Sequence, residues 1–336
     1  MINICSATKL ISNKELFLKV LNSGFTHLRI NFSHIKNEEA SMILGLTKDN
    51  YPDIKIIQDL QGPKIRIGDI ESLYINDIYT LDKYKMFVLV KEGETAKYQK
   101  NLPAIPICFE NYKLLKGTKK FILTNKDYQS TISVLDTAEY DWGTAFICMS
   151  DSECVFRAEK GLNAIGFDRT KIVLSEKDKK DVLWGLEHHV DIIILSFVSK
   201  VEQLIELKAY IKEYSDYMPL IWAKIECLDG ITNADLIIEK CDGFMIGRGD
   251  LSIEIPLIDL PKAQNDLILI CSSQNKECIV ATHLFDNYKD ILNISDITAI
   301  FHLKAIGATG FMMSNEVIFS KNPIKISQEF SIVINK

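Results

Sequence analysis

The chain has 336 residues, of which 47% are hydrophobic and 25% are charged, enough apolar material for a large core and a smaller second domain. The formal net charge is -6. No block of lysine and arginine is present, so neither nucleic acid nor a membrane surface is an expected partner. No secretory signal or membrane-spanning run is found, and the sequence predicts a cytoplasmic protein. Eight cysteines without a CxxC pair are typical of reduced, mostly buried thiols.

Short apolar runs alternate with segments of helical periodicity along most of the chain, which is typical of parallel β/α units. The runs are "INIC" (2–5), "THLRIN" (26–31), "IKIIQD" (54–59), "DIIILSF" (191–197), "LIWAKIE" (220–226), "GFMIGR" (243–248), "ECIVAT" (277–282) and "GFMMS" (310–314). Seven helical segments lie between them, including "NEEASMILGLTKDN" (37–50) and "ITNADLIIEKC" (231–241). Eight such units predict an α/β fold, a (β/α)8 TIM barrel.

One stretch between the third and fourth runs breaks this alternation. Residues 69–170 contain β-type runs such as "MFVLVKE", "KKFILT" and "TAFICMS", with little helical periodicity. We therefore predict a discontinuous barrel, 1–68 and 171–336, with an inserted all-β domain at 69–170. Because the insertion follows the C-terminal end of a strand, where barrel enzymes place their active sites, it could close over a site as a lid.

Polar residues follow nearly every apolar run at the same end. In a parallel barrel all C-terminal strand ends open at one mouth, and residues two apart in a strand share a face, so these side chains can converge. They are Arg29, Asn31, Ser33, Asp59, Ser196, Lys224, Glu226, Arg248, Asp250, Thr282 and Ser314. Taken alone, a Lys-x-Glu pair is more often a solvated surface pair. The occurrence of polar groups at one end of nearly every run favours a site.

Two carboxylates from neighbouring strands, Glu226 and Asp250, suit a hard divalent cation, Mg²⁺ or Mn²⁺, that keeps water and borrows oxygen atoms from its ligand. Lys224 places positive charge beside them, so the mouth is suited to an anion that also chelates a metal. Glycine amides of the "GRGD" turn, at Gly249 with Asp250, can contact a carboxylate or phosphate. Ser196 is a further expected substrate contact.

Several motifs resemble, in order and spacing, those of the pyruvate kinases. They are "LRINFSH", "QDLQGPKIRIG", "LSEKDKKDV", "VDIIILSFV", "WAKIE" and "CDGFMIGRGDLSIEIP...KAQ". The similarity covers about 20–68 and 171–285 and weakens elsewhere. The resemblance implies a barrel with a β lid, and transfer of phosphate from phosphoenolpyruvate to ADP with Mg²⁺ and often K⁺.

The resemblance also implies roles for individual residues. Glu226 and Asp250 would hold the divalent cation that chelates the carboxylate and enolate oxygens of the substrate. Lys224 would stabilise charge on the enolate oxygen and the moving phosphoryl group. Arg29 would grip the phosphate, with Arg66 nearby. This set fits phosphoryl transfer, which depends mainly on positioning and charge neutralisation.

A proton donor and a monovalent-ion site follow from the same resemblance. Thr282 would help to deliver a proton to the enolate carbon. Asn31, Ser33 and Asp59 match the family's K⁺ site. Lys64 stands in "GPKIR" where K⁺-requiring members usually carry Glu, and its ammonium group could replace the ion.

Other parts of the chain depart from the family pattern. The Gly-Pro near the nucleotide is replaced by "TK" at 8–9, "ATQMLES" reads "ATHLFDN", and "SGET" reads "SNEV". We expect the family's C-terminal effector domain to be absent. The residues expected to contact enolpyruvate and the metal match the family pattern, whereas those expected near the nucleotide differ from it. The prediction of phosphoenolpyruvate and pyruvate as ligands therefore has more support than that of ADP and ATP.

Three hypotheses remain open. The first is a phosphoenolpyruvate:ADP phosphotransferase without regulation. The second is a pyruvate-enolate enzyme with another acceptor or reaction, such as a specialised kinase, a lyase or a decarboxylase, in which His283 could carry a proton. The third, a non-catalytic metabolite-binding or interaction protein, does not explain why the charged residues survive. An oligomer through the barrel surfaces is compatible with each.

Overall fold

The computed structural model describes residues 1–70, 78–94, 102–124, 129–166, 171–172, 174–286, 288 and 290–336. The chain divides into two compact units, one of Met1–Gly62 with Leu174–Lys336 and one of Pro63–Val173. The sequence-based boundaries were 68/69 and 170/171. Each unit is described by itself below.

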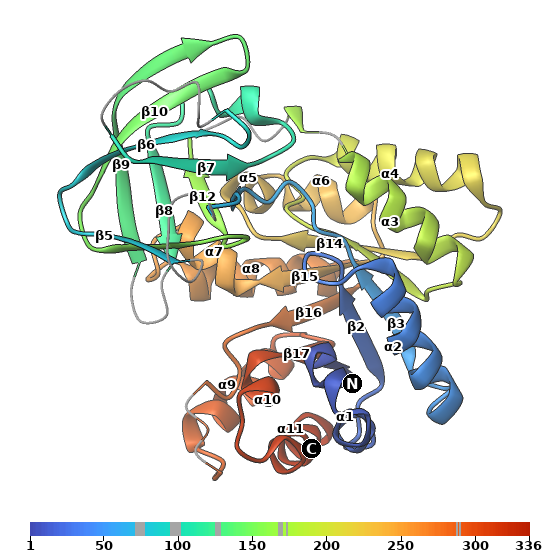
Figure 1. Ribbon diagram of the computed structural model, residues 1–336. Helices are drawn as coiled ribbons and strands as arrows, with labels where there is room; N and C mark the ends of the chain where they lie inside the picture. The colour runs from blue at the N-terminus through green and yellow to red at the C-terminus, as the bar shows by residue number, and fades with distance from the viewer. Residues whose placement is uncertain are drawn as a thin grey trace. The chain divides into compact units, whose positions relative to one another are not determined.

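The first unit is a closed barrel of eight parallel strands (Figure 1), which confirms the predicted (β/α)8 fold. Around the barrel the order is β1-β17-β16-β15-β14-β13-β3-β2. The strands are β1 (Ile2–Cys5), β2 (His27–Asn31), β3 (Lys55–Asp59), β13 (Ile192–Leu195), β14 (Leu220–Ile225), β15 (Gly243–Gly247), β16 (Glu277–Ala281) and β17 (Gly310–Met313). Each falls within one of the eight predicted runs.

Side chains alternate between two faces of each barrel strand, as the two-residue repeat of a strand requires. Those that point inward form a small apolar cluster inside the barrel: Ile4, Ile57, Ile192, Ile194, Trp222, Met245, Ile279, Ala281 and Met312. Those that point outward join a much larger core with the helices. Arg29 is aligned with Ile57 across β2 and β3 and is buried.

The helices of this unit follow the strands and, for the most part, match the predicted segments. They are η1 (Thr8–Ser12), α1 (Lys14–Leu21), α2 (Asn37–Asn50), α3 (Glu176–Glu187), α4 (Val201–Tyr214), α5 (Leu228–Thr232), α6 (Ala234–Glu239), α7 (Arg248–Glu254), α8 (Leu260–Ser273), α9 (Ile294–Ala305), α10 (Asn315–Ile318) and α11 (Pro323–Asn335). The segment expected at 231–241 is divided between α5 and α6. Sequence periodicity did not reveal α7 or α11.

Polar side chains fix where two of these helices begin. Ser175 accepts a hydrogen bond from the backbone N–H of Asp178 at the start of α3, and Asn293 accepts one from the N–H of Asp296 at the start of α9. Such caps satisfy amide groups that have no partner within the helix. The start of each helix is therefore set by one local residue.

The second unit is built mainly from strands. Among the described residues they are β4 (Arg66–Ile67), β5 (Ile78–Leu81), β6 (Met86–Lys91), β7 (Ala104–Cys108), β8 (Lys120–Thr124), β9 (Gln129–Tyr140), β10 (Gly143–Ser150), β11 (Cys154–Arg157) and β12 (Leu162–Ile165), together with the short helix η3 (Tyr112–Leu115). Seven strands form a sheet in the order β12-β8-β9-β10-β6-β7-β4, and β11 pairs with β5. The unit has a hydrophobic core of its own.

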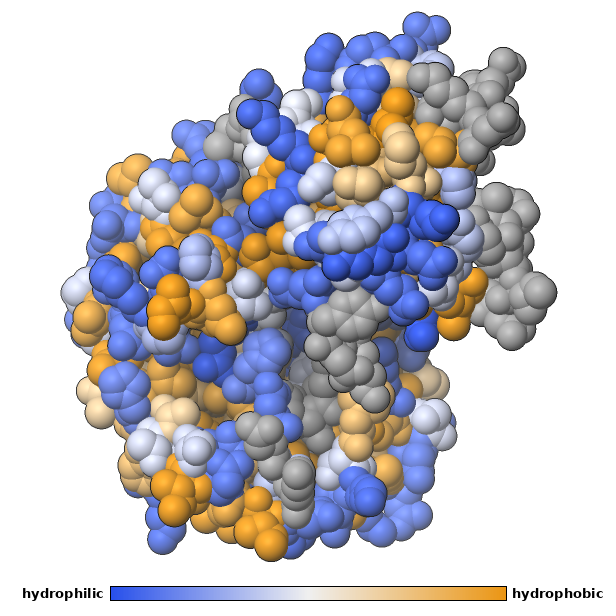
Figure 2. All heavy atoms as spheres, turned by 90° about the vertical axis from the view of Figure 1, so that its left-hand side faces the viewer, coloured by the Kyte–Doolittle hydropathy of each residue, from blue (hydrophilic) through white to orange (hydrophobic). Residues whose placement is uncertain are grey.

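The surface mixes apolar and polar side chains, and Figure 2 shows this mixture on one face. Among the most exposed large apolar residues are Ile258, Ile294 and Phe319. Scattered exposure of this kind is ordinary, because apolar atoms contribute more than half of most protein surfaces. Within the described ranges, no helix is both long and apolar enough to cross a bilayer. No disulfide bond joins any of the eight cysteines, which all lie in the described ranges, and seven of them are buried.

Gly310, in the pairing of β1 with β17 that closes the barrel, provides a test of the packing. A Cβ atom at Gly310 in β17 would lie 2.6 Å from both Ile2 Cβ and Ile279 Cδ1. We expect Gly310→Ala to lower the free energy of unfolding by about 2 kcal/mol, measured by urea denaturation, because the neighbouring strands cannot move apart without cost. The matched control is Gly45→Ala in α2, where a Cβ meets nothing within 4 Å and helix propensity predicts a gain of about 0.5–1 kcal/mol. Equal changes in the free energy of unfolding for Gly310→Ala and Gly45→Ala would contradict tight packing at Gly310.

Candidate active site at the C-terminal ends of the barrel strands

The strand repeat brings polar side chains onto the inner face at the barrel mouth. Asp59 comes two residues after Ile57, Ser196 comes two after Ile194, and Lys224 comes two after Trp222. Because residues two apart share a face, each of these polar groups follows an inward-pointing apolar residue. They form the layer at the C-terminal end of the barrel, the usual place of chemistry in this fold.

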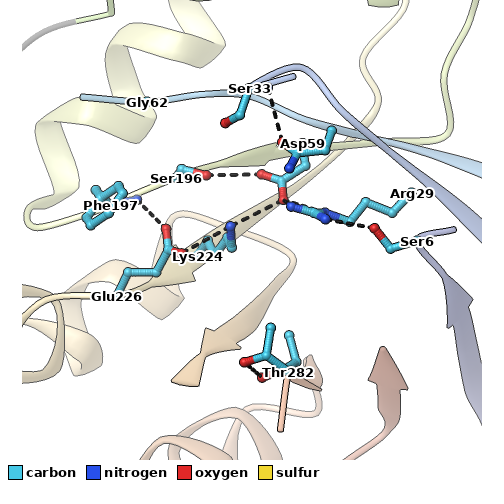
Figure 3. Close-up of polar contacts among 12 residues, drawn as sticks. Ser6, Arg29, Ser33, Asp59, Gly62, Ser196, Phe197, Lys224, Glu226 and Thr282 are labelled. Atoms are coloured by element: carbon cyan, nitrogen blue, oxygen red, sulfur yellow. Dashed lines mark hydrogen bonds and ion pairs between the residues drawn. The ribbon is translucent and has the colours of Figure 1, made fainter. Parts of the chain in front are cut away.

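The carboxylate of Asp59 is the centre of this layer, and Figure 3 shows the groups around it. Asp59 is completely buried. It accepts hydrogen bonds from Arg29 Nε at 2.6 Å and from Ser196 Oγ at 3.0 Å, and its Oδ2 lies 3.3 Å from Lys224 Nζ. Burial alone would raise the pKa of this carboxyl, but the charges of Arg29 and Lys224 and the hydrogen bonds outweigh burial and hold the pKa below its ordinary value.

Lys224 joins two carboxylates. Its Nζ lies 3.1 Å from Oε1 of Glu226 as well as close to Asp59, and its side chain is 13% exposed. Burial lowers the pKa of the ammonium group, but the charges of Asp59, Glu226 and, more weakly, Asp250 raise it, and the net pKa is raised. Lys224 is therefore a fixed positive charge, and Asp250 lies within electrostatic reach of it.

Glu226 is held in one position by its neighbours. It follows directly after β14 and is 2% exposed. Its Oε2 accepts a hydrogen bond from the backbone N–H of Phe197 at 3.2 Å, and Phe197 has a φ of +54°. A Cβ atom at Gly247 would lie 2.6 Å from Cγ of Glu226. The absence of a side chain at Gly247 thus leaves space for the Glu226 side chain.

Arg29 is anchored at both ends of its guanidinium group. Nη2 lies 2.5 Å from Asp59 Oδ2, and Nη1 donates a hydrogen bond to Ser6 Oγ at 2.8 Å. Ser6 comes two residues after the inward-pointing Ile4 in β1. The row from Ser6 through Arg29, Asp59 and Lys224 to Glu226 therefore crosses the barrel mouth without a break (Figure 3).

Thr282 and Gly249 form a second group at the mouth. The N–H of Gly249 donates a hydrogen bond to Thr282 Oγ1 at 3.2 Å, and the Thr282 hydroxyl donates one to the carbonyl of Ala281 at 2.6 Å. Arg248 donates to the carbonyl oxygens of Thr282 and His283. The Gly249 amide that was expected to bind an anion is therefore engaged with Thr282 in this structure.

The three residues of the predicted K⁺ site, Asn31, Ser33 and Asp59, all belong to the first unit. Asn31 and Asp59 are aligned across β2 and β3, and Asn31 Oδ1 accepts a hydrogen bond from the N–H of Ser33 at 3.1 Å. Asp59 already neutralises two cationic side chains. Lys64 lies in the second unit, where its Cε would be 3.0 Å from a Cβ atom at Gly161.

Arg66 also belongs to the second unit. It is buried, its Nη1 donates a hydrogen bond to the carbonyl of Glu159 at 2.7 Å, and its backbone pairs with Cys108. These contacts place Arg66 within its own sheet. A role at the barrel mouth stays a prediction.

The donor set at the mouth fits a divalent cation that keeps part of its water shell. Glu226 and Asp250 both lie near Lys224, and each carboxylate oxygen has more than one acceptor position. Within the described part of the chain, no group of three or more His, Cys, Asp and Glu is arranged to hold a metal ion. Two carboxylates with water and substrate oxygens are the usual arrangement for Mg²⁺, which seldom has an all-protein cage.

Comparison with known proteins places the chain in a family. A family model described as "Pyruvate kinase, barrel domain" matches residues 3–325. This chain belongs to the pyruvate kinase family. It is 26% identical over 319 residues to pyruvate kinase 2 of Synechocystis sp., covering 93% of this chain and 52% of that protein. It is 27% identical over 317 residues to the pyruvate kinase of Mycoplasma pneumoniae, covering 91% and 60%, and 28% identical over 341 residues to that of Clostridium acetobutylicum, covering 96% and 68%.

The chain spans about half the length of the first of these relatives, so the rest of that protein lies outside the match. The matched residues, 3–325, include both compact units.

Sequence reasoning missed two contributors to the site. Ser6 carries the only signal that could have been used, a small polar residue one position after the first apolar run. Phe197 acts through its backbone N–H, a role that residue type does not reveal. Arg248 was expected at the mouth, but its hydrogen bonds to the carbonyl oxygens of Thr282 and His283 were not.

The buried Asp59 carboxylate leads to a prediction about stability. Asp59→Asn would leave Arg29 and Lys224 charged and close together without their shared counter-ion, so we expect the free energy of unfolding at pH 7 to fall by about 3 kcal/mol. The pKa of Asp59 is lowered in the folded state, so its stabilising contribution is present above the unfolded value of about 4 and is lost as the pH falls through the lower folded value.

The measurement is urea denaturation of both proteins between pH 7 and pH 3. The difference in unfolding free energy should narrow below about pH 4. Asp53→Asn, at an exposed position, is the control and should change stability little. A difference between wild type and Asp59→Asn that stays constant down to pH 3 would contradict the shared ion pair.

Proposed function

We propose that the protein transfers the phosphoryl group of phosphoenolpyruvate to ADP, as a pyruvate kinase-like phosphotransferase that uses Mg²⁺ or Mn²⁺. The observation that carries the proposal is the Lys224 ammonium group, which lies 3.3 Å from Asp59 Oδ2 and 3.1 Å from Glu226 Oε1 at the barrel mouth. A fixed cation beside two carboxylates is suited to a substrate that combines a carboxylate, a phosphate and a developing enolate.

The chain's own residues divide the work of this reaction. Arg29, which is fixed by Asp59 and Ser6, contacts the phosphate. Lys224 neutralises the negative charge that grows on the enol oxygen as the oxygen–phosphorus bond breaks. Because both cations are already in place before the substrate binds, no reorganisation is needed during the transfer.

Glu226 and Asp250 would hold the divalent cation, which supplies charge neutralisation at the carboxylate and enolate oxygens when it is bound. Ser196 and Gly249 lie beside these groups and would contact the substrate. Thr282 would help to deliver a proton to the enolate carbon. These assignments rest on the positions of the side chains at one end of the barrel.

The remaining parts of the proposal concern the second unit and the monovalent ion. Arg66 would contact the phosphoryl group, and the β unit that carries it would act as a lid. Asn31, Ser33 and Asp59 would contribute to a K⁺ site, with the Lys64 ammonium group as a replacement for the ion. We further propose that the protein acts in the cytoplasm on free phosphoenolpyruvate and pyruvate.

Activity provides the direct test. Pyruvate formation from phosphoenolpyruvate, ADP and Mg²⁺ is followed in a coupled assay with lactate dehydrogenase. Lys224→Ala should lower kcat at least about a hundredfold, the scale expected on losing one preorganised charge donor. Lys262→Ala removes an exposed lysine that pairs with Asp266 in α8, and it should leave kcat nearly unchanged. A loss below tenfold for Lys224→Ala would refute the proposed role.

The dependence of activity on Mg²⁺ tests the proposed metal ligands. Asp250→Asn keeps the size of the side chain and removes its charge, so the Mg²⁺ concentration needed for half-maximal activity should rise about tenfold or more. Asp266→Asn, on the exposed face of α8, is the matched control. An Asp250→Asn enzyme whose Mg²⁺ titration is the same as that of the wild type would exclude Asp250 from the metal site.

A further inference from the structure

A cavity of about 730 Å³ opens beside the barrel mouth. Its lining includes Gly249 and Thr282, which belong to the proposed site, and continues into side chains to which the proposed reaction assigns no role. These are His283, Asp286, Tyr288 and Lys321, from the loop after β16 and the segment after α10. The cavity is therefore continuous with the place where the substrate is expected.

His283 and Asp286 form a hydrogen-bonded pair in this lining. His283 Nδ1 lies 2.7 Å from Asp286 Oδ2, and the two side chains are 56% and 48% exposed. A carboxylate at Nδ1 favours the tautomer with the proton on that nitrogen, which leaves a lone pair on Nε2. An imidazole that is oriented by a carboxylate in this way is the common form of a proton-transfer residue.

Nε2 of His283 lies close to Gly249, a residue of the proposed site. A Cβ atom placed on Gly249 would lie 4.0 Å from His283 Nε2 and 3.7 Å from Thr282 Oγ1. Two groups that can carry protons thus approach the same glycine. The Thr282 hydroxyl donates its single proton to the carbonyl of Ala281, and a hydroxyl is a weak base at neutral pH, whereas an imidazole changes its protonation state there.

The backbone around His283 is held in an unusual conformation. Thr282, His283 and Phe285 have φ values of +65°, +54° and +62°, a region that non-glycine residues seldom occupy. Arg248 donates hydrogen bonds to the carbonyl oxygens of Thr282 and His283. Strain that is maintained by such contacts is frequent where side chains must be aimed at a ligand.

We propose that His283, oriented by Asp286, is a catalytic acid–base residue for the methyl carbon of pyruvate. This proposal rests on the proposed function, because it requires pyruvate and its enolate at the mouth. In the direction from pyruvate, a C3–H bond breaks and its proton moves to Nε2. The electron pair forms the C2–C3 double bond while the carbonyl oxygen becomes an enolate oxygen beside Lys224. In the opposite direction Nε2 returns the proton to C3.

Several charged and titratable groups of the described residues surround the imidazole of His283. Asp286 faces Nδ1, Arg248 contacts the carbonyl oxygen of His283, and Asp290, Tyr288 and Lys321 line the same cavity. Tyr288 donates its hydroxyl proton to Glu329 at 2.6 Å. Of these groups, the imidazole is the one whose ordinary pKa lies in the neutral range.

The test is the exchange of the methyl protons of pyruvate for deuterium, followed by NMR in D₂O with Mg²⁺ between pH 5 and pH 9. His283→Asn is the main variant, because asparagine tolerates a positive φ and therefore suits the backbone at this position. The exchange rate should fall about a hundredfold, and the titration step of the wild type in the neutral range should disappear. Asp286→Asn should lower the rate less and should shift this step, and His302→Asn, at an exposed position in α9, should behave as the wild type.

Folding and ligand binding are measured on the same samples. Circular dichroism reports folding, and the effect of pyruvate on the water-proton relaxation of bound Mn²⁺ reports formation of the metal–pyruvate complex. If His283→Asn does not fold, the altered pH profile of Asp286→Asn decides the question.

The outcomes separate the two proposals. Slow exchange in a folded His283→Asn protein that still forms the Mn²⁺–pyruvate complex supports His283 as the acid–base residue. Exchange at the wild-type rate with an unchanged pH profile in both variants overturns the role of His283 and leaves the proposed function intact. If the wild-type protein neither binds Mn²⁺ with pyruvate nor exchanges the methyl protons, the proposed function and the role of His283 are both overturned.

Discussion

The arrangement of the barrel mouth depends on one buried carboxylate, that of Asp59, which is shared by Arg29 and Lys224. An arginine and a lysine this close would repel each other strongly in a poorly solvated environment, and neither could stay charged there without a counter-ion. With Asp59 between them, both cations are fixed while they keep further hydrogen-bonding capacity. Glu226 pairs with Lys224 on the side away from Asp59, so positive and negative side chains alternate across the mouth.

The same constraint explains why the site combines rigid strands with strained loops. The charged groups stand on the inner faces of strands, directly after apolar residues that fill the barrel, so their positions are set by the packing below them. The groups that complete the site come from loops. Phe197 turns its N–H toward Glu226 with a positive φ, and the loop that contains Thr282 is held by Arg248. Such conformations cost about 1–3 kcal/mol each, and the large core around the barrel can support that cost.

Much of the barrel could be predicted from the sequence because one physical rule governed it. A strand that is buried on both sides must be apolar along its length, and the runs that obey this rule coincide with β1 to β3 and β13 to β17. The polar residues that follow them converge for the same reason, as the contacts of Asp59 with Ser196 and Lys224 show. Family motifs added roles for these residues, which the strand repeat cannot supply.

What the sequence could not reveal depends on backbone geometry or on contacts between distant segments. The bond between Ser6 and Arg29 joins β1 to β2 through side chains that carry no shared motif. The engagement of Gly249 with Thr282 depends on the left-handed conformation of a threonine, which residue preferences argue against. The division of 231–241 into two short helices at Asn233 was also not apparent from periodicity. The helix α11 was missed although its buried residues Ile326, Phe330, Val333 and Ile334 recur at helical spacing.

Closure of the barrel joins the two ends of the chain, since Ile2 is aligned with Gly310 and Cys5 with Met313 in the pairing of β1 with β17. During synthesis on the ribosome, β1 emerges before the other barrel strands, and its partner β17 follows only after the six barrel strands between them have been translated. Over that interval the edges of an incomplete sheet are open to pairing with other nascent chains. Closure of the barrel therefore comes only after β17 has been translated, and the edges of the first strands stay exposed for the longest time.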